Sequence, residues 1–285
     1  MKNFISLIVS FLPMLASAQN VNQSLLWKVE GKGIVTASYI YGTIHLACPD
    51  DIIFTATLEH IFSQQHALYL ELDMDDPAVF GGMLHEMQMK GDTSLKTLLE
   101  EADYEKMAVG FEALTHLPLS LFNRSLPLIT MSAVYPALLN CSSTKSWEME
   151  LTNLAHQKHI PVYGLESLQE QLDVFESVSY VEQAQMLATA LQQTDSMKNE
   201  FLQLLQLYKQ KDVEALSNMI RSSETMGSME DALLNIRNKN WIPRIISLIK
   251  ENPIFFAVGA GHLGGQMGIL NLLKKEGYTV TPVAY

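Results

Sequence analysis

Short apolar stretches lie at the two ends of this sequence, and long segments with helical periodicity fill its middle. Two short strands within residues 24–45 are expected to form a hairpin around two glycines. A helix over residues 51–65 is predicted next, capped by Asp50 or Asp51, and then an apolar strand over residues 67–73. Because a helix separates two strands here, parallel pairing is expected.

The remaining chain is helical in pattern until its last thirty or so residues. Helical patterns cover residues 76–139, 147–158 and 167–251, with breaks near Asp195, Lys211 and 226–228, and a short strand is expected over 160–163. The end predicts a strand over 254–258, a glycine turn, a helix from His262 to Glu276 and a last strand over 278–283. This order predicts an α/β fold, with a mixed or parallel sheet built from the N- and C-terminal parts and a large helical insertion.

The first residues have the pattern of a secretory signal peptide. Lys2 precedes an apolar run that ends in Ala16, Ser17 and Ala18. We therefore expect a signal peptide over residues 1–18 and a single domain over 19–285. The protein would be exported to the periplasm or the extracellular space, with no stable membrane span in the mature chain.

Composition narrows the class of partner. The chain has 285 residues, 48% of them apolar, and a net charge of -12 with no basic run, so nucleic acid is not expected as a partner. Two cysteines, Cys48 and Cys141, lack the C-x-x-C spacing of a zinc site. In an oxidising compartment they can form a disulfide, or they can be two separate buried thiols; the sequence leaves both open.

The stretch FFAVGAGHLGG, residues 255–265, supports two kinds of chemistry. It contains G-x-G-x-x-G, but a dinucleotide site also needs an acidic residue after a following strand and further βα units, which this chain lacks. It also contains G-x-x-H ending at His262, and SYIYGTIH repeats that design, strand then G-x-x-H, ending at His45. A third G-x-x-H, ending at His85, lies in helical sequence. The two strand-end histidines therefore favour a histidine site over a phosphate site.

Acidic residues lie at the ends of other predicted strands. Glu71 and Asp73 end one strand, and Glu166 follows another. Imidazole and carboxylate ligands suit Zn²⁺, Mn²⁺, Co²⁺ or Fe²⁺, and an open coordination position would activate water for hydrolysis. Arg237 could then stabilise an oxyanion. The competing interpretation is structural: buried histidines, helix-capping acids and an ordinary arginine ion pair.

Five stretches in order also resemble the TraB/PrgY/GumN family, which includes the TIKI metalloproteases. They are YIYGTIHLACPD, LYLELD, EMELTNLAHQKHIPVYGLESLQEQL, IRNKNWIPRI and FFAVGAGHLGGQMGILNLLKKEGYTVTPV. The resemblance implies a fold similar to erythromycin esterase and the haem-binding ChaN-like proteins. It also implies a divalent-metal site containing His45, His262, Glu71 and Arg237, with the Mn²⁺- or Co²⁺-dependent proteolysis of the TIKI members. Where many relatives carry G-x-D, this chain has SWEMEL, so Glu148 or Glu150 stands in that place.

These observations lead to one main functional hypothesis. The protein would be a divalent-metal-dependent hydrolase, a peptidase acting on a peptide or protein substrate. Its metal would be Mn²⁺, Co²⁺ or Zn²⁺, held by His45, His262 and Glu71, and its catalytic residues would be Glu71, Glu166 and Arg237. The alternatives are a non-catalytic protein that binds haem, a metal or a peptide, and a partner-sequestering protein with a vestigial site. The sequence does not specify the substrate, the metal or the oligomeric state.

Overall fold

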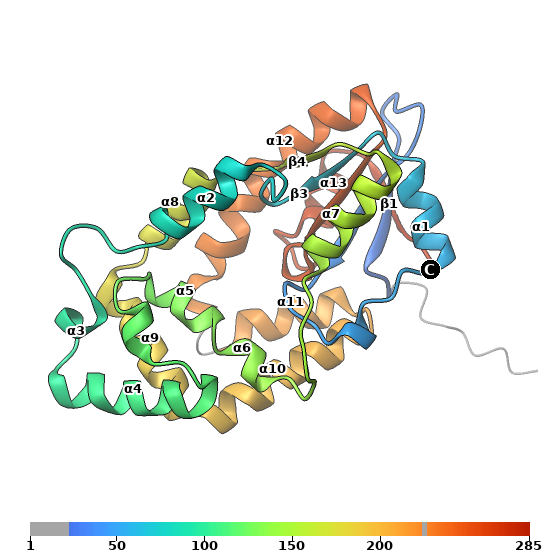
Figure 1. Ribbon diagram of the computed structural model, residues 1–285. Coiled ribbons are helices and arrows are strands. Elements are labelled where there is room, and N and C mark those ends of the chain that lie inside the picture. The colour runs from blue at the N-terminus through green and yellow to red at the C-terminus, as the bar shows by residue number, and fades with distance from the viewer. Residues whose placement is uncertain (1–22, 224–226) are drawn as a thin grey trace, which may run out of the picture.

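The computed structural model describes residues 23–223 and 227–285 of the chain, so the predicted signal peptide over residues 1–18 lies outside the described residues. Its central feature is a mixed six-stranded sheet, with helices packed around it and a larger group of helices extending to one side (Figure 1). The predicted α/β fold is confirmed. The strands are β1 Leu26–Glu30, β2 Ser38–Thr43, β3 Ala67–Leu70, β4 Val162–Gly164, β5 Ile254–Gly259 and β6 Thr279–Pro282.

The two ends of the chain meet in this sheet, whose strand order is β4-β3-β5-β2-β1-β6. The pairs β3–β4, β3–β5 and β2–β5 are parallel, whereas β1 pairs antiparallel with both β2 and β6. Four neighbouring strands therefore run in one direction. Their carboxyl ends lie along one edge of the sheet, where loops and side chains converge.

The helices fall into two groups along the chain. Those beside the sheet are α1 Ala56–Ser63, α7 Trp147–Lys158, α11 Val213–Ser222, α12 Ile236–Glu251 and α13 Ile269–Lys275, with the short turns η1 Pro49–Asp51 and η5 Ala260–His262. The helical insertion contains α2 Pro77–Glu86, α3 Leu95–Leu98, α4 Glu101–Thr115, η2 Leu119–Phe122, α5 Pro127–Ser132, α6 Tyr135–Leu138, α8 Leu168–Glu176 and α9 Tyr180–Gln192. Helix α10, Thr194–Lys209, joins the two groups, and η3 Gly227–Met229 and η4 Asp231–Asn235 precede α12.

Each group of helices has its own hydrophobic core. One core surrounds the sheet and contains Trp147, Trp241, Phe255 and Phe256. The other lies within the helical insertion, around residues such as Phe111, Leu126 and Leu187. Burying apolar area in both places stabilises the fold, and the boundary between the two cores is where a cavity can persist.

Two predicted helix starts are wrong. The helix expected at Asp51 begins at Ala56, because the hydroxyl of Thr55 accepts the Leu58 N–H as its cap, while Asp50 and Asp51 lie in η1. The helix expected from His262 begins only at Ile269. Gly265 has φ +78°, a left-handed conformation that interrupts a helix, so the preceding residues form the irregular turn that contains His262.

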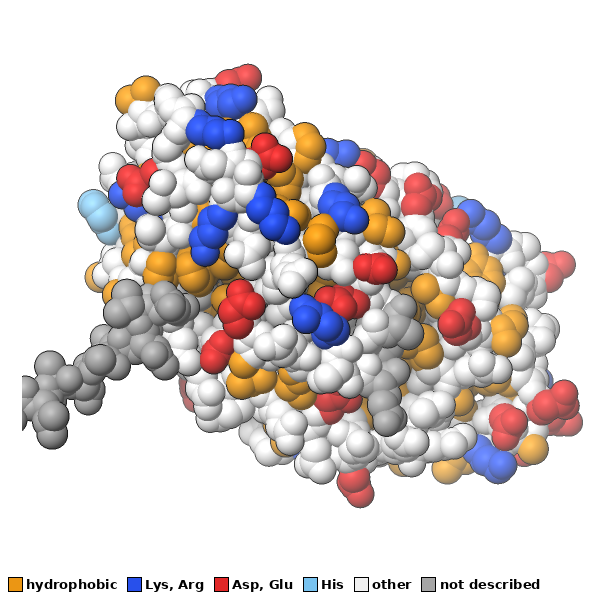
Figure 2. All heavy atoms as spheres, turned by 180° about the vertical axis from the view of Figure 1, so that it is seen from behind, with side chains coloured by type: hydrophobic (Ala, Val, Ile, Leu, Met, Phe, Trp, Pro, Cys, Tyr) orange, Lys and Arg blue, Asp and Glu red, His pale blue; other side chains and the backbone are white. Residues whose placement is uncertain are grey.

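Three further features concern the whole molecule. Cys48 and Cys141 form a disulfide, which settles the alternative left open by the sequence. Within the described ranges, no helix combines the length and apolar character needed to cross a bilayer. On the face shown in Figure 2, Lys and Arg side chains lie mainly over the upper part, and Asp and Glu side chains predominate over the lower part.

Candidate functional site at the carboxyl edge of the sheet

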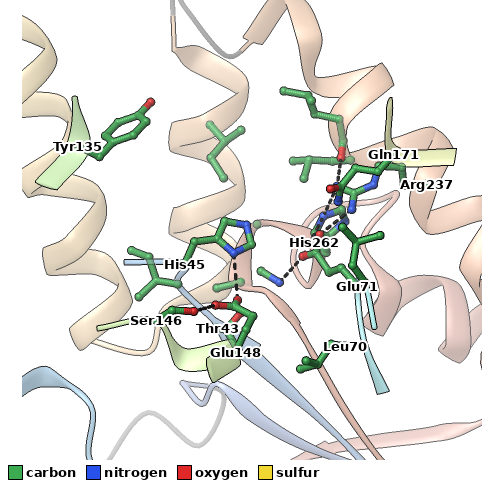
Figure 3. A pocket seen from close by; sticks show the side chains of 18 of the residues that line it. Thr43, His45, Leu70, Glu71, Tyr135, Ser146, Glu148, Gln171, Arg237 and His262 are labelled. Atoms are coloured by element: carbon green, nitrogen blue, oxygen red, sulfur yellow. Dashed lines mark hydrogen bonds and ion pairs between the residues drawn. The ribbon is translucent and has the colours of Figure 1, made fainter. Parts of the chain in front are cut away.

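The four parallel strands deliver the predicted site residues to one edge of the sheet. Strand β2 leads to His45, β3 to Glu71 and β5 to His262. Strand β4 leads to Glu166, whose backbone N–H donates to the Glu71 carbonyl, so the ladder between β3 and β4 continues past their ends. Arg237 reaches the same place from α12. Figure 3 shows four of these side chains grouped around one cavity: His45, Glu71, Arg237 and His262. Glu166 contacts Arg237 but does not line that cavity.

The glycines of the two G-x-x-H motifs permit this close approach. A Cβ atom on Gly42 would lie 2.8 Å from Leu263 Cδ1 and 3.2 Å from the Cα of Ala260, so a side chain there would push the two turns apart. A Cβ on Gly259 would lie 3.3 Å from Glu71 Oε1, 3.7 Å from His262 Cδ2 and 3.9 Å from His45 Nε2. The two histidines and Glu71 therefore surround the same glycine.

His262 is buried and held in one tautomer. Its Nδ1 lies 2.7 Å from Asn238 Oδ1, while Asn238 Nδ2 donates to the carbonyls of His262 and Met267. Since the amide nitrogen is used as a donor, Oδ1 must accept from Nδ1–H, and Nε2 keeps its lone pair. Burial lowers the pKa of His262 to about 3, so the ring is neutral at physiological pH.

His45 is oriented in the same way by a carboxylate. Its Nδ1 donates to Glu148 Oε1 at 2.9 Å, and the hydroxyls of Thr43 and Ser146 donate to the two Glu148 oxygens. Glu148 raises the pKa of His45, although the His45 side chain is 72% exposed and water screens part of this attraction. Glu150 instead pairs with Lys145. Of the two acids in SWEMEL, Glu148 is the one that reaches the site.

Arg237 connects the acids with His262. Its Nη2 donates to Glu71 Oε2 at 2.5 Å and to Glu166 Oε1 at 2.6 Å, and its Nη1 lies 3.1 Å from His262 Nε2. Nε donates to both oxygens of Glu166, at 3.1 and 3.2 Å. Glu166 also accepts from Trp241 Nε1 and from Gln171 Nε2. All three charged groups are less than 10% exposed, so their mutual attraction acts in a medium of low dielectric constant.

The two buried carboxyls have pKa values shifted in opposite directions. Burial alone would raise the pKa of Glu71, but the Arg237 guanidinium outweighs it, with help from the Gly259 N–H, and holds that pKa well below its usual range. Burial raises the pKa of Glu166, and the nearby Glu71 charge opposes the stabilising effect of Arg237. Such a divergence between neighbouring acids is typical of sites that divide acid and base roles.

The imidazole and carboxylate groups of the site are suitable ligands for a divalent cation, although they do not converge on one point as metal ligands would. Both imidazoles have Nδ1 engaged by an acceptor, as metal-ligating histidines usually do. Nε2 of His262 already carries a free lone pair, whereas His45, whose pKa is raised by Glu148, must lose the Nε2 proton to bind a cation. However, the described part of the chain contains no cluster of three or more His, Cys, Asp or Glu side chains in a geometry that would hold a metal. Arg237 Nη1 lies at His262 Nε2, and it would have to withdraw for that atom to bind a cation.

The other candidates from the sequence lie elsewhere. Asp73 accepts the backbone N–H of Asp75 in a turn, and His156 pairs with Asp75 on the surface. His85 is exposed on α2 beside Glu86, as expected for a chance G-x-x-H match. Sequence reasoning missed Asn238, Trp241 and Gln171. Asn238 and Trp241 share the buried face of α12, so a polar residue at a core position of that amphipathic helix was the available signal.

Comparison with known proteins bears on this arrangement. Residues 25–282 match the model of the TraB/PrgY/gumN family. The chain is similar to the metalloprotease TIKI2 of Danio rerio, 22% identical over 92% of this chain and 61% of the relative, and to TIKI1 of the same species, 21% identical over 90% and 62%. A shorter stretch of 63 residues is 38% identical to the metalloprotease TIKI homolog of Nematostella vectensis, covering 21% of this chain and 13% of that protein. The chain thus spans about three fifths of the length of the two Danio rerio relatives. No solved structure matches it.

Proposed function

This chain belongs to the TraB/PrgY/gumN family, and from that premise we propose that it is a divalent-metal-dependent hydrolase, a peptidase of the TIKI type. One observation carries the proposal: two histidines from separate strand ends surround Gly259 together with Glu71, and each has its Nδ1 engaged by an orienting partner. Histidines with a purely structural role would have no reason to lie together beside the same carboxylate. The relatives named as metalloproteases support the same class of activity.

In this proposal His45, His262 and Glu71 are the metal ligands, and the ion is Mn²⁺, Co²⁺ or Zn²⁺. When bound, such an ion supplies Lewis acidity and lowers the pKa of a coordinated water. Glu71 suits the role of ligand because its lowered pKa keeps it ionised. Arg237 can leave His262 without losing its anchor, since Nε and Nη2 remain bound to Glu166.

Arg237 would act on the substrate, and Glu166 would act as the general base for the attacking water. After Arg237 withdraws from His262, its Nη1 is available to donate to the oxygen of a carbonyl under attack, which stabilises the charge that develops there. Glu166 has the higher pKa of the two acids and is therefore the better proton acceptor near neutral pH. Glu166 also fixes the position of Arg237 through three hydrogen bonds.

The proposed compartment is the periplasm or the extracellular space, with residues 1–18 as the signal peptide. The disulfide between Cys48 and Cys141 supports this, since disulfides persist in oxidising compartments. The proposed substrate is a peptide or protein.

The proposal is tested by metal binding and peptide cleavage together. The full chain is expressed with its own leader, purified without chelators, and analysed for bound metals by elemental analysis. It is then loaded in turn with Mn²⁺, Co²⁺ and Zn²⁺ and incubated with a random peptide library, and new termini are identified by mass spectrometry. Variants His45→Ala and His262→Ala are expected to lose metal and cleavage, whereas His60→Ala, an exposed histidine on α1, should keep both.

Metal that persists when His45 and His262 are both replaced would rule out the site. Stoichiometric metal without cleavage of any peptide would favour a binding protein instead. A Soret band on adding haem, again without cleavage, would favour the haem-binding alternative.

A further inference from the structure

The candidate site opens into a cavity whose walls differ from its floor. The cavity has a volume of about 530 Å³, within the range of ligand-binding cavities. Its floor carries the two imidazoles of the site together with Glu71, Glu148 and Arg237. Its walls are apolar and come from both hydrophobic cores, including Leu204 from α10 and Leu128 and Phe175 from the helical insertion.

These wall residues are only half-buried, unlike the core residues behind them. Apolar side chains that face an open cavity keep part of their surface in water, and a ligand that covers them gains free energy. Four methionines also line the cavity, and their flexible thioether chains can adapt to different shapes. They are Met74, Met83, Met131 and Met229. The wall therefore suits bulky apolar groups of varied shape rather than one rigid ligand.

Two polar groups in the same lining have no hydrogen-bond partner among the residues that the structure describes. The Tyr135 hydroxyl and the Gln171 side-chain carbonyl make no hydrogen bond to any residue in the ranges 23–223 and 227–285. In Figure 3, Tyr135 lies across the cavity from Gln171 and Arg237, with His45 between them. A peptide carries backbone donors and acceptors that could satisfy both groups. An acyl chain has neither along its length and would leave them buried without a partner.

From the wall and these polar groups we infer the class of substrate: a peptide segment with bulky apolar side chains, such as Leu, Phe or Met, beside the bond that is cleaved. This inference rests on the proposed hydrolase function for the cleavage step, whereas occupancy of the cavity does not depend on it. Charged side chains at the same positions would lose hydration against an apolar wall, so they are disfavoured.

The test measures binding and cleavage separately on the metal-loaded full chain. Binding is followed by the fluorescence of the neutral apolar dye N-phenyl-1-naphthylamine and its displacement by peptides that differ at one position, Leu, Phe, Ala, Asp or Lys. Cleavage of the same peptides is followed by mass spectrometry. We expect kcat/KM for the Leu and Phe peptides to exceed that for the Asp and Lys peptides by at least about ten-fold. The order of dye displacement should be the same.

Variants in the wall connect the selectivity to this cavity. Leu128→Lys places a charge on the wall and should weaken dye binding by about ten-fold or more. Leu128→Trp narrows the cavity while keeping it apolar, so the Phe peptide should lose more activity than the Ala peptide. Leu121→Lys is the matched control, because Leu121 is 68% exposed and lies outside the cavity lining. It should change neither measurement.

The outcomes separate this inference from the proposed function. Apolar peptides that displace the dye but are never cleaved would support the apolar cavity and contradict the hydrolase. Cleavage that proceeds equally for all five peptides would support the hydrolase and overturn the inference. Displacement of the dye by a fatty acid but by no peptide would overturn it in favour of an acyl-chain ligand.

Discussion

At the scale of single residues, the two histidines of the site are oriented by partners of different charge. Asn238 holds the buried His262 with a neutral amide, whereas Glu148 holds the exposed His45 with a carboxylate. A buried neutral ring needs an acceptor that adds no charge, because an extra buried carboxylate would be costly beside Glu71 and Glu166. The Glu148 side chain is only 12% exposed, but its charge is stabilised by His45 and by the hydroxyls of Thr43 and Ser146, which donate to its two oxygens.

Replacing Asn238 should uncouple His262 from its fixed tautomer. In Asn238→Ala, His262 loses the acceptor for Nδ1–H, and the carbonyls of His262 and Met267 lose their donor. We expect metal affinity to fall by roughly 10- to 100-fold. The free energy of unfolding should fall by about 1–3 kcal/mol. Isothermal titration with Mn²⁺ and chemical denaturation measure the two effects.

The matched control for this change is Asn240→Ala, two residues further along α12 and exposed to solvent. It should leave metal affinity unchanged and alter stability by no more than about 0.5 kcal/mol. Equal losses of metal affinity in the two variants would contradict the assigned role of Asn238.

Replacing Glu148 tests which acid of SWEMEL serves His45. Glu148→Gln keeps an oxygen that can accept from His45 Nδ1–H but removes the negative charge. We expect metal affinity to fall by roughly ten-fold or more, because the ring becomes a less basic ligand. Glu150→Gln, which removes only the surface pair with Lys145, should leave the affinity unchanged. Isothermal titration with Mn²⁺ measures the affinity of both variants. A larger loss in Glu150→Gln than in Glu148→Gln would assign Glu150 to the site.

The sequence predicted the residues that follow strands but not those that orient them. His45, Glu71, Glu166 and His262 could be found because each directly follows an apolar strand, and parallel strands bring their ends together. Asn238 lies inside a helix 24 residues before His262, and no local pattern indicates which core position of α12 faces that ring. Such a contact depends on how the helix packs against the sheet.

At the scale of elements, the turn after β4 is held in place by the start of α8. Ser167 and Glu170 form a capping box, and Arg244 of α12 donates both to Glu170 and to the Leu165 carbonyl. The arginine therefore ties the segment that carries Glu166 to the helix that follows. The pair of Arg244 and Glu170 is more than 40% exposed on both sides, so its contribution to stability is modest.

This pair should give stability a defined pH dependence. The hydrogen bond that Glu170 accepts from Arg244 lowers the pKa of Glu170 from 4.5 to about 2. A carboxyl with a lowered pKa stabilises the folded state above its unfolded pKa, and this contribution is lost as the pH falls through the folded value. Glu170→Gln keeps a residue type that completes a capping box, so it tests the charge. It should cost about 0.5–1 kcal/mol at pH 7.

The difference between wild type and Glu170→Gln should shrink between pH 4.5 and pH 2, as measured by urea denaturation at each pH. A difference that stays constant over this range would show that the charge of Glu170 contributes nothing. Glu182→Gln is a suitable control, because Glu182 lies in the first turn of α9 and makes no side-chain ion pair within the described residues.

The sequence predicted the bounds of some helices correctly and those of others wrongly. Helix α7 begins and ends where its pattern predicts, since Ser146 caps it and a left-handed His159 ends it. The helix after β5 was misplaced by seven residues, from His262 to Ile269. Apolar spacing continues through that stretch, but the conformation of Gly265 and the packing of the turn against α11 override it. Glycine-rich segments are where apolar periodicity is least informative.

At the scale of the whole molecule, the site lies between two hydrophobic cores that belong to different parts of the chain. The sheet supplies the floor of the cavity, and the helical insertion supplies much of its walls. This division explains why the sequence identified the floor and gave no pattern for the walls. Strand ends are fixed by pairing, whereas the position of Leu128 or Phe175 at the cavity depends on how the helices pack together.

One covalent bond joins these parts beside the site. The disulfide links Cys48, three residues after His45, to Cys141, which precedes Ser146 and Glu148. Next to it, Ala47 and Lys145 exchange two backbone hydrogen bonds, of 3.0 and 2.9 Å. The segment that carries His45 is thereby fastened to the segment that carries its carboxylate partner. The bond should therefore act both on global stability and on the orientation of His45.

The variant Cys48→Ser/Cys141→Ser separates these two effects. The bond spans 93 residues, so its loss frees a large unfolded loop, and the free energy of unfolding should fall by about 2–4 kcal/mol. Metal affinity, measured well below the unfolding midpoint, should also fall, because His45 and Glu148 are then held together only by noncovalent contacts. Dithiothreitol should reproduce both losses in the wild type and change nothing further in the variant. If the variant unfolds more easily yet binds metal as tightly as the wild type, the disulfide stabilises the fold but does not position His45, and the hydrogen bonds around Glu148 are sufficient to orient the ring.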